Sequence, residues 1–437
     1  MNMRMIDVHH PPTAADPSEI WCQRRRHGAP DTKARSREHL LVLMSALIPL
    51  ASSWVVWWSP GGANDFNQRV ALAPFDVALG GLLVGWGSTR VRAGFARPSP
   101  STGVLLAVGF TAVFAIAFAA NPSYRGVEYS VRLLAGVAIV DVARRMDSAA
   151  VRRVCIVLAA AGAIESVLAV AQSIHGRGFA LYPIDHDGGL LAFGDTHAGR
   201  GGFAHPYHLT VFLLLALFAA LIGGRSSTGR ELRLWVGTAS FLGAGIAVTF
   251  SRAMILGLVP AAVVWGLARR DHIGRSARPI VGALFLGLAC TSLLFADGWT
   301  TRARQSAGSG ADRGRVTLAE HGLGIAADHP FAGIGPARYV IAVAEESLPE
   351  VELLPPHNII VQAAAELGAA GGVIVALAGL WFARRLLRRP VLLIGGAGLL
   401  VPFLLLDAYP YVFPAGLAIS ALWIGLLENP TVREHAS

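Results

Sequence analysis

Residues 234–268 read LWVGTASFLGAGIAVTFSRAMILGLVPAAVVWGLA, and this stretch decides the class of fold. It is apolar for long enough to cross a bilayer twice, because one helix needs about 20 apolar residues to do so. Its one charged residue, Arg252, stands near the middle. An arginine is costly at the centre of a membrane span but not at the tip of a helical hairpin. We therefore predict two spans, 234–250 and 251–268, that meet at Ser251 and Arg252.

The whole chain has the composition of a membrane protein. Of its 437 residues, 54% are hydrophobic and only 15% are charged, whereas a soluble domain carries about 25% charged residues. Further apolar runs predict spans at 40–58, 70–87, 103–120, 126–143, 154–173, 208–223, 279–297, 357–382, 391–407 and 411–427. We expect an all-α, polytopic integral membrane protein of about 12 transmembrane helices.

The positions of the arginines predict the orientation. Basic residues favour the cytoplasmic side of short loops, and with the N-terminus inside, every short cytoplasmic loop is basic. We predict a disordered cytoplasmic N-terminal tail over 1–38, a transmembrane domain over 39–428 and a cytoplasmic tail over 429–437. The net charge of +9 is then a consequence of topology, so nucleic acid is not an expected partner.

Two long loops, 174–207 and 298–356, then face outward, and long loops commonly carry function. Outward arginines oppose the charge bias, so those in and beside these loops need another explanation. They are Arg177, Arg200, Arg302, Arg304, Arg313, Arg315 and Arg338. Apolar residues recur among small ones over 313–328, which favours a helix along the membrane surface. We therefore expect the loop 298–356 to be largely helical.

Three residues at the outer membrane boundary could carry chemistry. Arg200 precedes the sixth span, Arg252 stands at the hairpin tip, and His357 follows Pro355 and Pro356 at the start of the tenth span. A guanidinium binds phosphate through a planar fork of donors, and an imidazole accepts a proton near neutral pH. The set suits a lipid-linked diphosphate. Taken singly, each arginine is equally well explained by lipid headgroups, and the histidine by a helix start.

Other polar residues have plainer explanations. Asp76 and Glu165 lie within apolar spans and could each pair with Arg132, either near a site or as a structural ion pair. Histidines and aspartates are frequent between 175 and 208, but only His205 and His208 have the spacing of metal ligands. We therefore expect no metal site and no cofactor. Asp141, near a span end, is expected to be structural.

Four segments follow one another in a definite order. They are RGGFAHP (200–206), SRA (251–253), HPFAGIGPARY (329–339), and PHN followed by ELG within 356–368. In order, spacing and outward placement, over roughly residues 150–385, they resemble the O-antigen ligase/O-antigen polymerase family of membrane proteins. One departure is Tyr207, where that family usually has asparagine.

The resemblance implies a bacterial inner-membrane enzyme that transfers an undecaprenyl-diphosphate-linked glycan to an acceptor hydroxyl at the outer face. The acceptor would be a glycan or lipid A-core, and neither a metal nor a nucleotide sugar would take part. Carried over by position, His357 is catalytic, and Arg200 and Arg252 bind the diphosphate, with Arg313 or Arg315 as a further match. The supporting residues are then Asn358, Ser251, Arg132 and Asp76.

Direct attack on the anomeric carbon predicts inversion of its configuration. Arginines at the leaving diphosphate would stabilise the transition state, and His357 would accept the hydroxyl proton. Two alternatives stay open. A transporter or lipid-linked glycan flippase would show midplane substrate residues and pseudo-symmetric halves. Within the family, the sequence does not separate a ligase from a polymerase.

Overall fold

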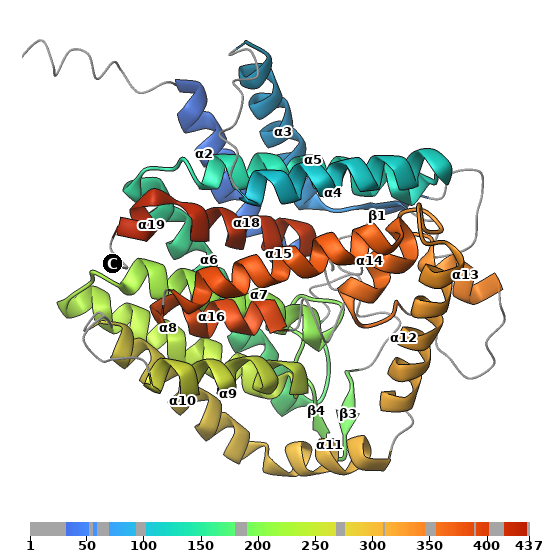
Figure 1. Cartoon of the computed structure of the whole chain (residues 1–437). Helices are drawn as coiled ribbons and strands as arrows, with labels where there is room; N and C mark the ends of the chain where they lie inside the picture. The colour runs from blue at the N-terminus through green and yellow to red at the C-terminus, as the bar shows by residue number, and fades with distance from the viewer. Residues whose placement is uncertain are drawn as a thin grey trace, which may run out of the picture.

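The computed structural model describes most of the chain (Figure 1). The described residues are 32–51, 56–58, 70–92, 102–179, 190–267, 276–308, 311–345, 355–388, 390–401 and 415–434. Residues 1–31 of the predicted tail lie outside them. Residues 32–38 were predicted to be disordered, but they form the first turns of α2 (Thr32–Leu47). A tertiary contact orders them, because Arg37 Nη1 donates to Thr89 Oγ1 of the next helix at 3.0 Å.

Helices dominate the described residues and are arranged as a bundle (Figure 1). Most predicted spans overlap a single helix, although the ends differ by several residues. These helices are α3 (Pro74–Arg92), α4 (Thr102–Ala120), α5 (Tyr124–Ala143), α6 (Ser148–His175), α7 (Pro206–Gly224), α8 (Gly229–Val248), α9 (Arg252–Leu267), α10 (Ala277–Leu294), α16 (Pro390–Val401) and α18 (Gly416–Glu428).

Four of the described helices are long and apolar enough to cross a membrane: α6, α7, α10 and α15 (Ala369–Leu387). Shorter apolar helices cover Leu105–Ala120, Gly257–Gly266 and Gly416–Glu428. These helices support the predicted class, a helical membrane protein. The count of about 12 spans and the domain boundaries stay predictions.

The centre of the bundle is α7, which is buried along almost its whole length. Its side chains from Leu209 to Leu221 are inaccessible or nearly so. A helix that is apolar on every side and buried on every side has neighbours all round it, and here α6, α8 and α16 contact it. The Arg200 segment that precedes α7 is therefore attached to the best-packed element of the fold.

The predicted split of residues 234–268 into two helices is confirmed. α8 ends at Val248 and α9 begins at Arg252. Between them Phe250 has a left-handed backbone, with φ of 49°, a conformation that side chains other than glycine rarely adopt. Its ring is fully buried against Phe193 and Trp299, with centroids 5.3 and 5.2 Å apart. This packing holds the turn that carries Ser251 and Arg252.

The predicted spans 40–58 and 70–87 are wrong at their outer ends. Two short antiparallel strands, β1 (Val56–Trp58) and β2 (Val70–Leu72), pair there, with Trp57 opposite Ala71. The helix α2 stops at Leu47 and a 3-10 turn, Ile48–Ala51, follows it. A short apolar run rich in valine and tryptophan suits a strand as well as a helix, so the composition did not separate them.

The predicted span 357–382 is also wrong as a single helix. It is broken at Gly368, whose φ is 79°, into α14 (Ile359–Leu367) and α15. The second helix folds back on the first, because Gly372 lies against the Ile360 carbonyl and Ala364. Ile359 shares an apolar cluster with Val375. The start of α14, and His357 before it, therefore lies beside the interior of α15 rather than beyond its end.

The long loop 298–356 is largely helical over its described residues, as predicted. It contains most of α11 (Ala296–Gly308), all of α12 (Ala311–Asp328) and α13 (Tyr339–Glu345). α12 packs on α14, since Gly322 faces Val361 and Pro356. In the other loop, 174–207, the strands β3 (Ala192–Phe193) and β4 (Thr196–His197) form a small hairpin.

The predicted C-terminal tail is docked on the bundle through its first residues. Asn429 Nδ2 donates to the carbonyls of Ala143 at 2.8 Å and Met146 at 3.0 Å. The guanidinium of Arg225 donates to the carbonyls of Thr431 and Val432, both at 3.0 Å. The short helix α19 (Pro430–Glu434) follows, so this segment closes one end of α5, α7 and α18.

Candidate functional site

The Arg200 loop, residues 199–205, is held by two polar side chains of α6. The Gln172 carboxamide oxygen accepts the backbone N–H groups of Arg200 at 2.9 Å and Gly201 at 2.8 Å, and its Nε2 donates to the Gly201 carbonyl at 2.9 Å. The Glu165 carboxylate accepts the Gly202 N–H at 2.6 Å. Gln172 and Glu165 are both buried. The loop is therefore fixed to a long, continuous helix.

Close approach to α6 explains the glycines of this loop. A side chain at Gly199 would overlap the Ala169 carbonyl, and one at Gly201 would overlap the Glu165 carboxylate. Gly201 also has φ of 56°, which glycine adopts without steric cost. Arg200 is only 8% exposed, and its Nη1 lies 3.4 Å from the Ala204 carbonyl. The two glycines therefore let the backbone around Arg200 come within hydrogen-bonding distance of α6.

The structure brings the Arg200 loop and the Arg252 turn together. The Gly199 N–H donates to the Val248 carbonyl at the end of α8 at 2.9 Å. The Thr210 hydroxyl in the first turns of α7 bonds the Thr249 hydroxyl, also at 2.9 Å. Ser251 and Arg252, the residues that follow, are half-buried. Two predicted diphosphate ligands thus come from segments that are hydrogen-bonded to one another.

His357 and Asn358 begin α14. The Asn358 side chain accepts the N–H groups of Ile360 at 2.9 Å and Val361 at 3.1 Å, so it caps the helix, as such a residue commonly does. The His357 N–H donates to the Pro355 carbonyl at 2.8 Å, and His357 is half-buried. Asn358 therefore fixes the first turn of α14, directly after His357.

The motif turn, residues 329–339, wraps the other end of α14. The turn surrounds the carboxylate of Glu366 of α14, which is 1% exposed. This carboxylate accepts the N–H groups of Ala337 at 2.8 Å and Tyr339 at 3.2 Å. The backbone N–H of Gly335 also donates to the Glu366 carbonyl, at 3.0 Å. Ala337 has φ of 59°, and its bond to Glu366 offsets this unfavourable conformation. The two segments HPFAGIGPARY and ELG are therefore one structural unit.

Glycines make that contact possible. A side chain at Gly333 would overlap the Glu366 carbonyl group, and one at Gly335 would overlap Asn121 in the connection between α4 and α5. Their φ values are 60° and 100°. Ser123 of the same connection donates to the Pro336 carbonyl at 3.2 Å. The motif turn thus joins α14 to the α4–α5 connection.

Arg313 and Arg315 lie in the first turns of α12. Gly322, in the middle of α12, faces Val361 and Pro356 at the start of α14, and Tyr339 donates to the Leu318 carbonyl at 2.6 Å. The middle of α12 therefore lies beside the His357 end of α14, and the two arginines precede that contact by about two helical turns. Arg315 is exposed, whereas the side chain of Arg313 lies outside the described residues.

Asp76 and Arg132 form the ion pair that was one predicted alternative. Arg132 Nη2 lies 3.4 Å from Asp76 Oδ2, and its Nε lies 2.9 Å from Glu128 Oε1. The guanidinium also lies over the Phe75 ring, 5.6 Å from its centroid. Glu165, the other predicted partner, accepts the bond from Gly202. The pair ties α3 to α5.

The predicted residues thus fall into two groups of contacts. One holds the Arg200 loop and the Arg252 turn; the other holds His357, α12 and the motif turn. The helix α11 leads from the first to the second, since Trp299 packs on Phe250 and the chain continues from α11 toward α12. Among the described residues, no cluster of three or more histidines, cysteines or acids is arranged to hold a metal ion.

The sequence did not indicate Gln172 at all, and it indicated Glu366 only as part of the ELG segment. Both residues hold the segments described above. A glutamine and a glutamate within predicted apolar spans are a usable signal, because a polar group there needs a partner. Their partners are backbone N–H groups 28 and 29 residues away. No pattern of residue types identifies a backbone partner.

One stretch of the chain is similar to a known protein family. Residues 237–376 match a family model described as O-Antigen ligase, and no curated protein matches the chain. The matched residues include Arg252, the motif turn, His357 and Glu366, and they begin after the Arg200 loop. This part of the chain is therefore similar to O-antigen ligases.

Proposed function

We propose that this protein transfers a glycan from an undecaprenyl-diphosphate carrier to an acceptor hydroxyl at the outer face of the bacterial inner membrane. The similarity of residues 237–376 to O-antigen ligases supports glycan transfer in a membrane. The proposal adds the donor, the site and the single displacement. The acceptor is lipid A-core or a growing glycan.

One observation carries the assignment of the donor site. The Gly199–Val248 and Thr210–Thr249 hydrogen bonds, both 2.9 Å, tie the loop before α7 to the turn between α8 and α9. Each of the two segments contributes one arginine. Two guanidiniums held on rigid backbone suit a diphosphate, since planar forks bind its oxygens without reorganising.

In the proposed reaction, the acceptor oxygen attacks the anomeric carbon while the bond from that carbon to the diphosphate oxygen breaks. Negative charge grows on the leaving diphosphate, and Arg200 and Arg252 stabilise it. His357 accepts the proton of the attacking hydroxyl. Arg315, and Arg313 beside it, would bind the donor from the α12 side. Ser251, Asn358 and the Arg132–Asp76 pair support these groups as turn, cap and helix-to-helix contact.

The test is transfer by the purified full chain in liposomes that contain an undecaprenyl-diphosphate-linked glycan. We expect His357→Ala and Arg252→Ala to lower transfer by at least about 10³-fold, the scale of losing a group used in the transition state. Arg304→Ala is the matched control, because it removes an exposed arginine of α11. Transfer at the wild-type rate in His357→Ala or Arg252→Ala would refute the assigned roles.

Two further measurements test the chemistry of the step. NMR of the product should show an inverted anomeric configuration; retention would exclude a single displacement. Addition of EDTA should leave the rate unchanged, because the proposed charge stabilisation comes from arginines.

A further inference from the structure

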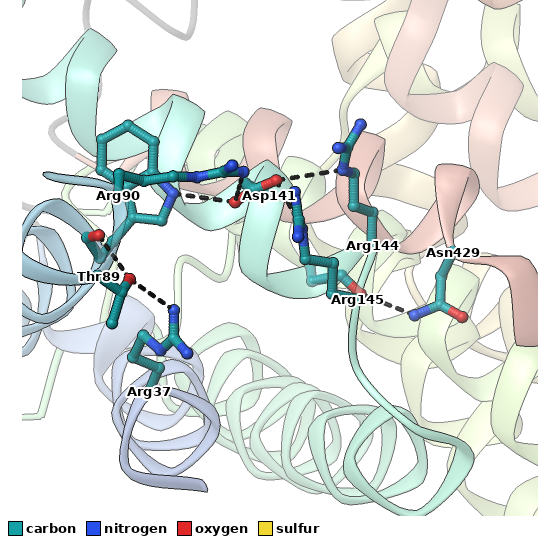
Figure 2. A network of polar contacts seen from close by, with 9 residues as sticks. Arg37, Thr89, Arg90, Asp141, Arg144, Arg145 and Asn429 are labelled. Atoms are coloured by element: carbon teal, nitrogen blue, oxygen red, sulfur yellow. Dashed lines mark hydrogen bonds and ion pairs between the residues drawn. The ribbon is translucent and has the colours of Figure 1, made fainter. Parts of the chain in front are cut away.

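A second cluster of arginines lies where α3 and α5 end, on the face that the arginine bias assigns to the cytoplasm. Its centre is Asp141, one oxygen of which accepts hydrogen bonds from Trp86 Nε1 at 3.0 Å and Arg90 Nη2 at 2.5 Å. The other oxygen meets Arg145 Nε at 2.9 Å and Arg144 Nε at 3.3 Å. Figure 2 shows the three guanidiniums converging on this carboxylate.

The cluster has more positive than negative charge, and the positive charge is outermost. One carboxylate faces three guanidiniums, which leaves two positive charges unbalanced. The Asp141 side chain is 13% exposed, whereas Arg144 is 45% and Arg145 57% exposed. The neighbouring Arg153–Glu38 pair is built the same way, with the acid 17% and the arginine 48% exposed.

The geometry leaves donors available for a ligand. Arg144 and Arg145 both approach Asp141 through Nε. Within the described part of the chain, their terminal nitrogens have no hydrogen-bond acceptor, and Figure 2 shows those of Arg144 directed away from Asp141. Guanidiniums anchored through Nε keep a pair of N–H groups for an anion, which suits a phosphate.

The surroundings indicate where that phosphate comes from. The helices that end at this cluster expose large apolar side chains along their length, including Val84 and Val91 on α3 and Leu134 and Val137 on α5. In a membrane protein such side chains face acyl chains. A phosphate bound at the cluster is therefore at the level where a phospholipid headgroup adjoins its own acyl chains.

We propose that the Asp141 arginine cluster binds the phosphate of an anionic phospholipid in the cytoplasmic leaflet. Juxtamembrane arginines attract anionic headgroups, each by about 1 kcal/mol, which corresponds to about a fivefold change in affinity. Asp141 holds three of them in one place, and Arg37 of α2 lies at its edge through Thr89 (Figure 2). A bound lipid would join the ends of α2, α3 and α5.

The experiment uses the full chain in detergent, titrated with dioleoyl phosphatidylglycerol or dioleoyl phosphatidylcholine. Bound lipid is counted by native mass spectrometry, and the thermal midpoint is measured in parallel. The test variant is Arg144→Gln/Arg145→Gln. The matched control is Arg230→Gln/Arg233→Gln, which removes two exposed arginines from the start of α8 and changes the net charge equally.

We expect the wild type to prefer phosphatidylglycerol and the test variant to bind it about 25-fold more weakly, while the control stays within about twofold. Equal weakening in both variants, or none in either, would overturn the site. If the double variant does not fold, Arg145→Gln alone should weaken binding about fivefold. Inorganic phosphate that reproduces the full thermal shift would assign the site to a free anion and overturn the lipid.

Discussion

The Arg200 loop and the motif turn use the same device for different ends. In each, buried polar side chains of a neighbouring helix accept backbone N–H groups, and glycines allow the backbones to touch. The Arg200 loop rests on α6, which is continuous from Ser148 to His175. The motif turn rests on α14, which runs only from Ile359 to Leu367.

The difference in length between α6 and α14 decides whether the helix positions the loop or the loop positions the helix. A long helix in the bundle is rigid, so α6 positions the loop and with it Arg200. A short helix that folds back at Gly368 is not fixed by its own length, so the motif turn positions α14 and with it His357. Two glycine-rich motifs of similar appearance therefore position Arg200 in one case and brace a helix in the other.

The largest effect should come from closing the space beneath the motif turn. Gly333→Ala would place a methyl group on the Glu366 carbonyl at φ of 60°. We expect a loss of more than about 4 kcal/mol of stability, the scale of overpacking combined with strained backbone, seen as loss of the folded protein in detergent. Gly324→Ala is the control, since nothing lies within 4 Å of its Cβ. Equal folding of both variants would contradict the tight contact.

Removing the carboxylate of Glu366 or of Glu165 should cost the two regions different amounts of stability. Glu366→Ala leaves the N–H groups of Ala337 and Tyr339 without their acceptor, which costs about 2–4 kcal/mol. Glu165→Ala removes the acceptor of Gly202 alone and should cost about 1–2 kcal/mol. Thermal unfolding in detergent ranks them, and a larger loss for Glu165→Ala would reverse the comparison.

The two glutamines test positioning in the reaction. Gln172→Ala releases the backbone of Arg200 and should lower transfer about 10²-fold, because small displacements at a site are costly. Among the described residues, the Gln362 side chain donates only to Glu366, at 3.2 Å, so Gln362→Ala should lower transfer by less than about threefold. Initial rates at saturating acceptor distinguish them. A wild-type rate for Gln172→Ala would separate the Arg200 loop from the reaction.

The smallest expected effect is a gain of stability on replacing a residue by glycine. Ala337→Gly relieves a left-handed alanine and is expected to raise stability by up to about 1 kcal/mol. Ala342→Gly, in the neighbouring helix α13, should lower it by about 0.5–1 kcal/mol. Both are read as shifts of the thermal midpoint. Destabilisation by Ala337→Gly would show that its methyl group, not its backbone, matters.

The sequence predicted the features that depend on composition and local charge. Arg252 within an apolar run located the turn between α8 and α9, and the pattern over 313–328 located α12. It did not predict the break at Gly368, because glycine also occurs within membrane helices and its φ is not visible in the sequence. Nor did it predict that β1 and β2 pair, since the two runs are apolar like the spans beside them.

The same distinction holds for the site. Arginine and histidine types at the outer boundary indicated which residues to consider. Their relation depends on backbone contacts such as Gly199 to Val248, for which any residue could supply the carbonyl. The pairing of HPFAGIGPARY with ELG likewise rests on backbone N–H groups and on Glu366, and it emerges only from the fold.

The most direct test of the central claim is a cryo-EM structure of the full chain with a non-hydrolysable undecaprenyl methylene-diphosphonate glycan. We expect the diphosphonate between the guanidiniums of Arg200 and Arg252, with the His357 imidazole facing the anomeric carbon from the opposite side. Diphosphonate bound away from both arginines, or separated from His357 by the width of the bundle, would contradict it.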